Sequence, residues 1–451
     1  MASNKATRIT LFSLATPQMR AFHVTWLAFF VCFFAWFAVA PLMPVIKGEF
    51  NLTLAQIANI NIAAVGITVI ARLLIGPMCD KYGPRRTYTA LLVLGSVPVM
   101  GIAFATSYET FLVFRLAIGA IGASFVITQF HTSVMFAPNV VGTANATVGG
   151  WGNAGGGVTQ SVMPLVLAAL VSLGINQSLG WRLSMFVPGI MMLAVAVLYW
   201  RYTQDTPEGD IVDLRARGIA VGSGKAGGWA MFKQAMANYR VWMLAVTYGA
   251  CFGIEIFIHA VAASYYVERF GLSLTSAGMA AGSFGLLALF ARALGGIGSD
   301  RVARRWGLDG RTWLLFTLMV GEGVGLLAFS SMGAVGPAIV AMLFFGLFTH
   351  MACGSTYALV PFIDRRALGG VAGIIGAGGN IGAVAAGFLL KWTGSVPDTL
   401  YTLGWVVLCS ALCAGAIRFS VSHKQAEQRL YDEAVARRMD TAEAGEMAQA
   451  A

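Results

Sequence analysis

Charged side chains are scarce in this sequence. Of its 451 residues only 11% are Asp, Glu, Lys or Arg, 57% are hydrophobic, and the mean hydropathy is +0.73. Soluble domains carry about 25% charged residues. The composition therefore excludes a soluble globular protein and indicates a polytopic membrane protein surrounded by lipid.

Several other features are absent. The six cysteines have no metal-ligand spacing and read as reduced packing residues: Cys32, Cys79, Cys251, Cys353, Cys409 and Cys413. No nucleophile–base pair or metal cluster is visible, so we expect neither an enzyme nor a cofactor or metal. We also expect no cleavable signal peptide, because the apolar run Val24–Ile46 is longer than the apolar region of a signal peptide and lacks a small-residue cleavage site.

Twelve apolar runs are long enough to cross a hydrocarbon layer of ~30 Å. They predict an all-α membrane protein with twelve transmembrane helices. The runs are centred within 24–46, 56–78, 87–106, 111–136, 143–172, 182–201, 240–266, 275–298, 312–332, 337–361, 368–392 and 399–421.

The net charge of +10 follows membrane topology and is not a nucleic-acid signature. With both termini in the cytoplasm, most Lys and Arg fall in the tails and inner loops, as the positive-inside rule requires. The exceptions are four residues outside and three within spans: Lys47, Arg182, Arg269 and Lys391, then Arg72, Arg115 and Arg292. We expect a multi-pass protein of the cell (inner) membrane.

A polar, Gly/Ser-containing break divides the spans six and six. We expect a cytoplasmic N-terminal tail (1–23), an N-terminal half (24–202), a cytoplasmic linker (203–239), a C-terminal half (240–421) and a cytoplasmic tail (422–451). The charged, helix-prone last segment is expected to be a solvated helix without transport chemistry.

The loop after the second span has a glycine, an acid–base pair, a second glycine and paired basic residues. These are Gly76, Asp80, Lys81, Gly83, Arg85 and Arg86. The pattern is typical of the major facilitator superfamily, where it gates the cytoplasmic side. The acid can cap a helix end while the basic residues bind carbonyls and lipid phosphates.

The two halves repeat weakly. Arg72-x-x-x-Gly76-x-x-x-Asp80-Lys81 recurs as Arg292-x-x-x-Gly296-x-x-x-Asp300-Arg301. A glycine stretch also recurs: Gly149, Gly152 and Asn153 correspond to Gly376, Gly379 and Asn380. Paired six-span halves with a substrate site between them are the architecture of a secondary transporter.

The glycine stretch is the most unusual part of the chain, because six of the nine residues 149–157 are glycine. Helix remains the expected conformation at membrane depth. Two interpretations stay open. The missing side chains allow close helix packing through small-xxx-small pairs, or they let a small ligand rest on bare backbone beside the Asn153 amide.

Arg72 and Arg292 are the strongest binding candidates. An arginine within the membrane costs at least ~2.5–3.5 kcal/mol and is functional by default. The alternative is that each side chain extends to the membrane–water interface. That would account for one arginine, but it accounts less well for two at repeat-related positions. No acid above the loop motif in their own spans neutralises them, so the natural counter-ion is a substrate anion. Two planar guanidinium forks suit a small planar oxyanion.

Aromatic side chains could form flat walls on either side of a planar anion, although any one of the 29 phenylalanines is more often plain core. The candidates are Phe37 in the first span, Phe130 in the fourth, and Tyr248 and Phe252 one turn apart in the seventh.

Here a family resemblance becomes specific. Gly149-Gly-Trp-Gly-Asn153-Ala-Gly-Gly-Gly resembles the signature of the nitrate/nitrite porter family of the major facilitator superfamily. FAVAPLMPVIKGEFNLT, Thr128-Gln129-Phe130 and CFGIE are similar to high-affinity nitrate carriers. The resemblance implies that Arg72 and Arg292 bind nitrate, that Phe130, Tyr248 and Phe252 shape its slot, and that Asn153 and Asn380 donate amides. His131 departs from the tryptophan of eukaryotic members.

Glu255 and His259 stand at i and i+4 in the seventh span. They form either a structural hydrogen bond or a proton site. Arg115 begins a pattern, Arg-x-x-x-Gly-x-x-Gly, similar to one in proton-coupled members of the superfamily. We therefore expect proton-coupled nitrate symport, with nitrite as a further candidate substrate, in a monomer. Nitrate/nitrite exchange is the alternative, and a sensor built on a transport fold is a third class.

Overall fold

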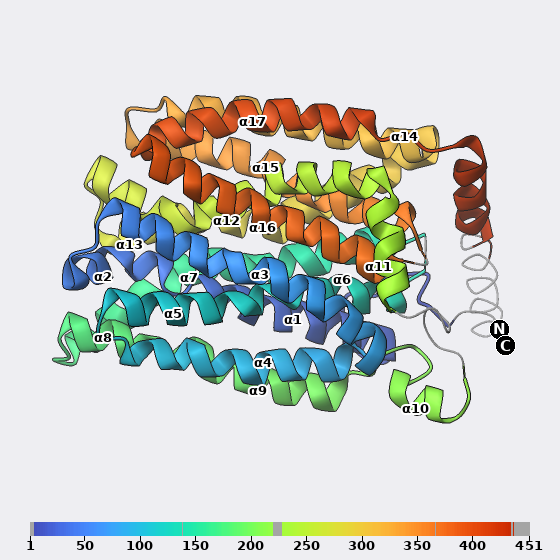
Figure 1. Cartoon of the computed structure of the whole chain (residues 1–451), viewed down its shortest axis with the longest axis horizontal. Coiled ribbons are helices and arrows are strands. Elements are labelled where there is room, and N and C mark those ends of the chain that lie inside the picture. The colour runs from blue at the N-terminus through green and yellow to red at the C-terminus, as the bar shows by residue number, and fades with distance from the viewer. Residues whose placement is uncertain (1–3, 138, 220–227, 366, 434–435, 437–451) are drawn as a thin grey trace.

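The computed structural model describes residues 4–137, 139–219, 228–365, 367–433 and 436. Within these residues long helices lie side by side, and the extended structure consists of two isolated bridges, Ala6 with Phe136 and Thr206 with Gly209. Figure 1 shows α10, α11 and the helix 421–433 gathered at one end of the bundle, with α2 and α8 at the other.

The helices of the first half begin with α1 and end with α9. They are α1 (Pro17–Phe37), η1 (Ala40–Leu42), α2 (Met43–Phe50), α3 (Leu54–Tyr82), α4 (Pro84–Gly101), η2 (Ile102–Phe104), α5 (Tyr108–Gly119), η3 (Ala120–Ala123), α6 (Ser124–Met135), α7 (Val141–Ser172), α8 (Gln177–Ser184) and α9 (Phe186–Tyr202). The linker region holds α10 (Ile211–Ala216) and α11 (Gly228–Ala237). The second half comprises α12 (Tyr239–Phe270), α13 (Leu274–Leu286), α14 (Ala288–Ser330), α15 (Val335–Ile363), α16 (Leu368–Thr393) and α17 (Val396–Ala416).

Eleven helical segments of the described chain are long and apolar enough to cross a membrane. One of them, Leu274–Ser330, has 57 residues, more than twice the ~20 that one crossing needs. Gly307 interrupts α14 with a φ of 59°, which glycine adopts without a steric penalty. The segment therefore crosses twice, and the predicted fold of twelve transmembrane helices is confirmed.

Local sequence explains where several spans begin. Thr16, Thr53 and Ser107 precede α1, α3 and α5, and each side-chain oxygen accepts a hydrogen bond from a backbone N–H of the first turn. In the first span, Pro41 and Pro44 occupy the first turns of η1 and α2, where a missing N–H costs nothing. The span consequently continues in short pieces after Phe37.

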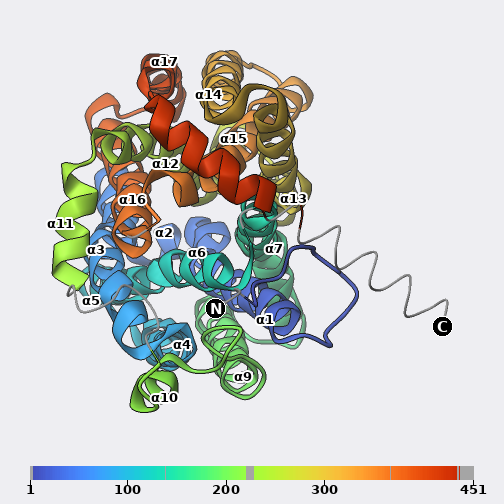
Figure 2. The ribbon, with the colours of Figure 1, turned by 90° about the vertical axis from the view of Figure 1, so that its right-hand side faces the viewer.

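The two halves meet through the spans that carry the sequence repeats. Between the halves, α3 packs against α16, and α7 packs against α13, α14 and α15. Figure 2 looks onto one end of the bundle and shows α3 beside α16 on one side, with α7 next to α13 on the other. Both glycine stretches and both candidate arginines therefore lie along the interface between the halves.

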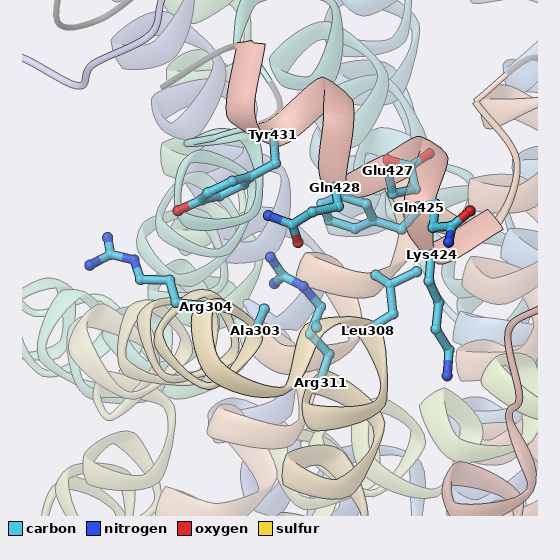
Figure 3. A pocket seen from close by; sticks show the side chains of 11 residues that line it. Ala303, Arg304, Leu308, Arg311, Lys424, Gln425, Glu427, Gln428 and Tyr431 are labelled. Atoms are coloured by element: carbon cyan, nitrogen blue, oxygen red, sulfur yellow. The ribbon is translucent and has the colours of Figure 1, made fainter. Parts of the chain in front are cut away.

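The helix 421–433 is largely exposed, as expected for a solvated tail, and side-chain contacts also hold it against the bundle. Lys424 pairs with Asp309 of α14 at 2.5 Å, and Glu427 pairs with Arg365 at 2.5 Å. His423 Nε2 lies 2.8 Å from the carbonyl of Phe362. A cavity of about 320 Å³ lies between this helix and α14 (Figure 3). Residues 437–451 of the predicted tail and 220–227 of the predicted linker lie outside the described residues.

Candidate functional site between the halves

Arg72 of α3 is fully buried between the two halves, so its guanidinium does not extend to the surface of the bundle. Its Nε and Nη2 donate to the carbonyl of Gly122 at 3.1 and 3.0 Å, and its Nη1 donates to the carbonyl of Gly376 at 2.5 Å. The guanidinium carbon lies 4.8 Å from the ring centroid of Phe125 and 5.2 Å from that of Phe252. No carboxylate of the described chain forms an ion pair with Arg72, so its charge is balanced only by carbonyl dipoles and ring faces.

Arg292 of α14 is equally buried, but it has a carboxylate partner. Its Nη2 pairs with Glu255 of α12, and its Nη1 donates to the hydroxyl of Tyr357 of α15 at 2.5 Å. The expectation that a substrate is the counter-ion of both arginines is therefore wrong for Arg292. That expectation considered acids in the same spans, whereas the partner comes from a neighbouring helix.

Glu255 lies at the centre of a buried polar cluster. Its Oε1 is 3.8 Å from His259 Nε2, and its Oε2 is 3.6 Å from Nδ1 of His350 on α15. The thiol of Cys353 lies 3.7 Å from the same Oε2. Glu255 and both histidines are at most 1% exposed. Because an unpaired charge is costly in this environment, the arrangement allows Glu255 either to pair with Arg292 or to take up a proton.

Three aromatic rings form one wall of the site. Tyr248 and Phe252 stack with centroids 4.8 Å apart and an interplanar angle of 9°. Phe125 of α6 stacks against both, at 5.6 Å from Tyr248 and 6.2 Å from Phe252. Phe252 also lies 5.7 Å from the guanidinium carbon of Arg292, so one ring contacts both arginines.

Two predicted aromatics lie elsewhere. Phe130 was predicted to shape the anion site, but the ring of α6 that lies over Arg72 is that of Phe125. Phe130 is buried in α6, and its ring stacks on neither arginine in the described structure. The ring of Phe37 is 5.0 Å from that of His259, so it packs on the proton candidate instead of on the arginines.

The structure gives the glycines two kinds of neighbour, which correspond to the two interpretations of the sequence: close helix packing and room at a ligand site. A Cβ on Gly149 would lie 2.5 Å from the ring of Tyr357, and one on Gly376 would lie 3.0 Å from Nη1 of Arg72. A Cβ on Gly379 would lie 2.6 Å from Phe252. Gly152, by contrast, packs on the ring of Phe29. Some glycines therefore permit close helix packing, while others make room for the site's own side chains.

Asn153 and Asn380 are both fully buried, and neither the oxygen nor the nitrogen of either amide has a hydrogen-bond partner among the described residues. Each stands one helical turn after Gly149 or Gly376, on the same face. Leaving a buried polar group unpaired costs about 1–3 kcal/mol. Two such amides at repeat-related positions point to a polar ligand.

The site is closed at both ends of the bundle. At the end of α10 and α11, Thr143 of α7 donates to Asp300 of α14 at 2.6 Å. At the other end, Lys47 of α2 pairs with Glu268 of α12 at 2.7 Å, and Lys391 of α16 donates to Asn59 of α3 at 3.4 Å. These three contacts join the two halves at both ends, and Arg72, Arg292 and Glu255 between them are fully buried.

One basic residue of the loop motif, Arg85, binds a backbone carbonyl as predicted. Arg85 donates to the carbonyl of Trp200 at 2.8 Å and pairs with Asp210 at 2.5 Å. Gly76 packs against the backbone of Gly369, and a Cβ there would lie 3.4 Å from its carbonyl oxygen. The backbone carbonyls of Asp80 and Lys81 accept hydrogen bonds from Arg215, at 2.6 and 3.0 Å.

The helix-capping acid is Asp205 of the linker, not Asp80. Its carboxylate sits over Gly83, where no side chain would fit, and accepts hydrogen bonds from the backbone N–H groups of Arg85 and Ile211 at 2.8 and 3.0 Å. Burial raises the pKa of Asp205 to about 6. In the second motif, Asp300 pairs with Arg311 at 2.7 Å. Arg86 and Arg301 are exposed.

Arg115, the third intramembrane arginine, is not in the cluster around Glu255. It is buried in α5, and its Nη1 donates to the carbonyl of Trp36 at 3.0 Å. The described structure gives it no contact with a titratable group, so the prediction of a proton-coupling role receives no support from its surroundings.

Sequence reasoning missed three residues of the site: Phe125, His350 and Tyr357. The last two carried a signal, because they stand seven residues apart in an apolar span and therefore lie on one helix face. Phe125 carried none, since nothing separates it from the other phenylalanines of the core.

This fold, with its charged site enclosed between two related halves, is that of a secondary transporter. The Major Facilitator Superfamily profile matches residues 25–387. Two solved structures share the fold: a proton:xylose symporter, XylE (TM-score 0.68, 14% identity, 88% of this chain and 94% of that one), and the Escherichia coli fucose:proton symporter FucP (TM-score 0.62, 14% identity, 90% and 100%).

Similar proteins of known name identify the family within this superfamily. High affinity nitrate transporter 2.5 of Arabidopsis thaliana is 42% identical over 383 residues, which is 85% of this chain and 76% of the relative. Nitrate/nitrite transporter NrtP of Picosynechococcus sp. is 31% identical over 453 residues, 82% of this chain and 84% of the relative. The chain belongs to the nitrate/nitrite porter family of the Major Facilitator Superfamily, and the expectation of a transporter and not an enzyme is confirmed.

Proposed function

We propose that this protein carries nitrate, and nitrite as a further candidate substrate, across the cell membrane by alternating access and in symport with protons. The distribution of positive charge supports cytoplasmic termini, and the completeness of the site within one chain supports a monomer. The proposal of nitrate as substrate rests on the names of the relatives. The proposal of proton coupling rests on the geometry of the site.

The chemistry of the site suits a small planar anion. Arg72 has a positive charge without a carboxylate partner in the described structure, and the stacked rings of Tyr248 and Phe252 provide a flat surface beside it. The unpaired amides of Asn153 and Asn380 supply further donors. Guanidinium forks match a planar oxyanion in geometry and charge.

The observation that carries the proton coupling is the buried ion pair between Arg292 and Glu255. When the site is empty, ionised Glu255 offsets one of the two arginine charges. When nitrate binds and Glu255 is protonated, nitrate offsets that charge instead. The core then has the same net charge on the loaded and on the empty leg, so neither leg buries an additional uncompensated charge.

Symport also answers the energetic problem of import. Moving nitrate into a cell that is negative inside costs about 2.3 kcal/mol per 100 mV. One accompanying proton cancels that charge, and a second makes the potential favourable. In nitrate/nitrite exchange, the alternative, the carrier is loaded in both directions and needs no carboxylate to balance the empty state.

The test uses purified protein in liposomes and the Glu255→Gln variant. Glutamine keeps the shape of the side chain but cannot carry the negative charge on the empty leg. We expect nitrate uptake driven by a pH gradient to be abolished, while nitrate/nitrate counterflow, which never uses the empty carrier, persists. pH-driven uptake by the variant would refute the role of Glu255, and wild-type uptake that requires internal nitrite would establish exchange.

A further inference from the structure

We propose that His350 is the proton partner of Glu255: the proton taken up with nitrate is held between Oε2 of Glu255 and Nδ1 of His350. The inference rests on the proposed function for the identity of the anion. It adds a residue on α15 that the sequence analysis did not single out, and it assigns the proton to a particular pair of atoms.

The backbone fixes the tautomer of His350. Its Nε2 lies 3.0 Å from the carbonyl oxygen of Phe284 on α13. A carbonyl can only accept a hydrogen bond, so Nε2 carries the hydrogen and Nδ1 of the neutral ring is a bare acceptor. That acceptor has no hydrogen-bond partner among the described residues, and it faces Oε2 of Glu255 at 3.6 Å.

An acceptor that faces a carboxylate oxygen leaves a place for one proton. While Glu255 is ionised, Arg292 holds the same Oε2 through Nη2 and stabilises its charge. Once an anion takes the place of the carboxylate on Arg292, the charge on Glu255 is left uncompensated and must be neutralised. A protonated carboxyl then needs an acceptor for its O–H group, and Nδ1 of His350 is the acceptor in place.

The protonation step breaks one bond and forms one. A hydronium ion transfers a proton to Oε2, so that one of its O–H bonds breaks, a carboxyl O–H bond forms, a water molecule is released, and the new O–H donates to Nδ1. His350 keeps its hydrogen on Nε2 and remains neutral. On the return leg the proton leaves, and the carboxylate pairs with Arg292 again.

The other titratable and charged groups around Glu255 come from three helices. They are His259 on α12, Arg292 and Glu322 on α14, and Cys353 and Tyr357 on α15. His259 faces the other carboxylate oxygen at 3.8 Å, but neither of its ring nitrogens has a hydrogen-bond partner in the described chain. Its tautomer is therefore not fixed, whereas that of His350 is.

The experiment measures the protons taken up when potassium nitrate binds to the purified, weakly buffered protein. His350→Phe removes both ring nitrogens, and its proton uptake should be lost. His350→Asn places an amide oxygen near the position of Nδ1 but is too short to reach the Phe284 carbonyl, so it should retain uptake. His131→Asn, at a buried histidine bonded to Tyr199 and the Gln204 carbonyl, is the matched control.

Three outcomes would overturn the inference: unchanged proton uptake in His350→Phe, an Asn variant as deficient as the Phe variant, or no proton uptake by the wild type. A purely structural role for the Phe284 contact predicts the second. If neither variant folds, the wild type labelled with ¹⁵N in its five histidine rings decides. One Nδ1 signal should then change from bare to hydrogen-bonded on nitrate addition, and unchanged signals would refute the proposal.

These outcomes are separable from those for symport, because they concern binding at equilibrium in the absence of a membrane. Liposomes that show only exchange would refute the symport while the proton between Glu255 and His350 could still be measured. Conversely, pH-driven uptake without the His350 effect would leave symport intact and remove His350 from it.

Discussion

Arg292 Nη1 and the hydroxyl oxygen of Tyr357 lie 2.5 Å apart. That hydroxyl is in turn 2.7 Å from the hydroxyl of Tyr248. Because Tyr357 accepts from the guanidinium, its own hydrogen is available to Tyr248. Tyr357 thus orients one terminal nitrogen of Arg292, Nη1, and Glu255 orients the other, Nη2. When nitrate replaces the carboxylate of Glu255, Tyr357 remains as the partner of Arg292.

Tyr357→Phe should weaken nitrate binding. Hydrogen bonds to charged groups contribute about 1.5–3 kcal/mol, so we expect KM for nitrate to rise on the order of tenfold or more, with normal amounts of protein in the membrane. Tyr266→Phe is the control, since among the described residues the one hydrogen-bond partner of that buried hydroxyl is the sulfur of Met342, at 3.6 Å. Equal KM values for Tyr357→Phe and the wild type would show that the hydroxyl does not orient Arg292.

Replacing Arg72 or Arg292 by lysine keeps the charge but removes the fork that donates in two directions. For either variant we expect nitrate uptake to fall at least about tenfold, or about 1.4 kcal/mol. Initial rates in liposomes, at matched amounts of reconstituted protein, measure the effect. Near-normal uptake by a lysine variant would remove that arginine from the substrate site.

Gly149→Ala and Gly152→Ala should fail in different ways. The new methyl group at 149 meets the ring of Tyr357, which belongs to the site, whereas the one at 152 meets the ring of Phe29. We expect the first variant to reach the membrane and transport poorly, and the second to lose thermal stability. Gly66→Ala, with open space around its Cβ position, is the control. Normal transport by Gly149→Ala would exclude a contribution of this surface.

Asp205 predicts a pH dependence of stability. Burial raises its pKa in the folded protein to about 6, above the ordinary value of 3.8. The folded state therefore binds the proton more tightly, and this contribution to stability grows as pH falls through 6 and declines as pH rises. Between pH 7 and 5 we expect a gain of about 1 kcal/mol relative to Asp205→Asn, which does not titrate. Thermal unfolding at both pH values measures it, and parallel profiles would contradict it.

The local sequence determined much of this protein. Long apolar runs must form helices because a bilayer leaves backbone groups no other partner, and this is why the twelve spans could be predicted from the amino acids. The arginines and asparagines of the candidate site were also visible, because polar groups at membrane depth are rare and these recur at repeat-related positions.

Only the tertiary structure decided which groups meet across helices. Arg292 and Glu255 are 37 residues apart, and their pairing depends on how α12 and α14 pack. The choice of Phe125 over Phe130 depends on the rotation of α6 about its axis, which its sequence does not specify because polar and apolar residues alternate around the helix without one apolar face. Residues such as Asn153 show their chemistry in the sequence, whereas partners such as His350 become apparent only once neighbouring helices are in place, because these contacts join residues distant along the chain.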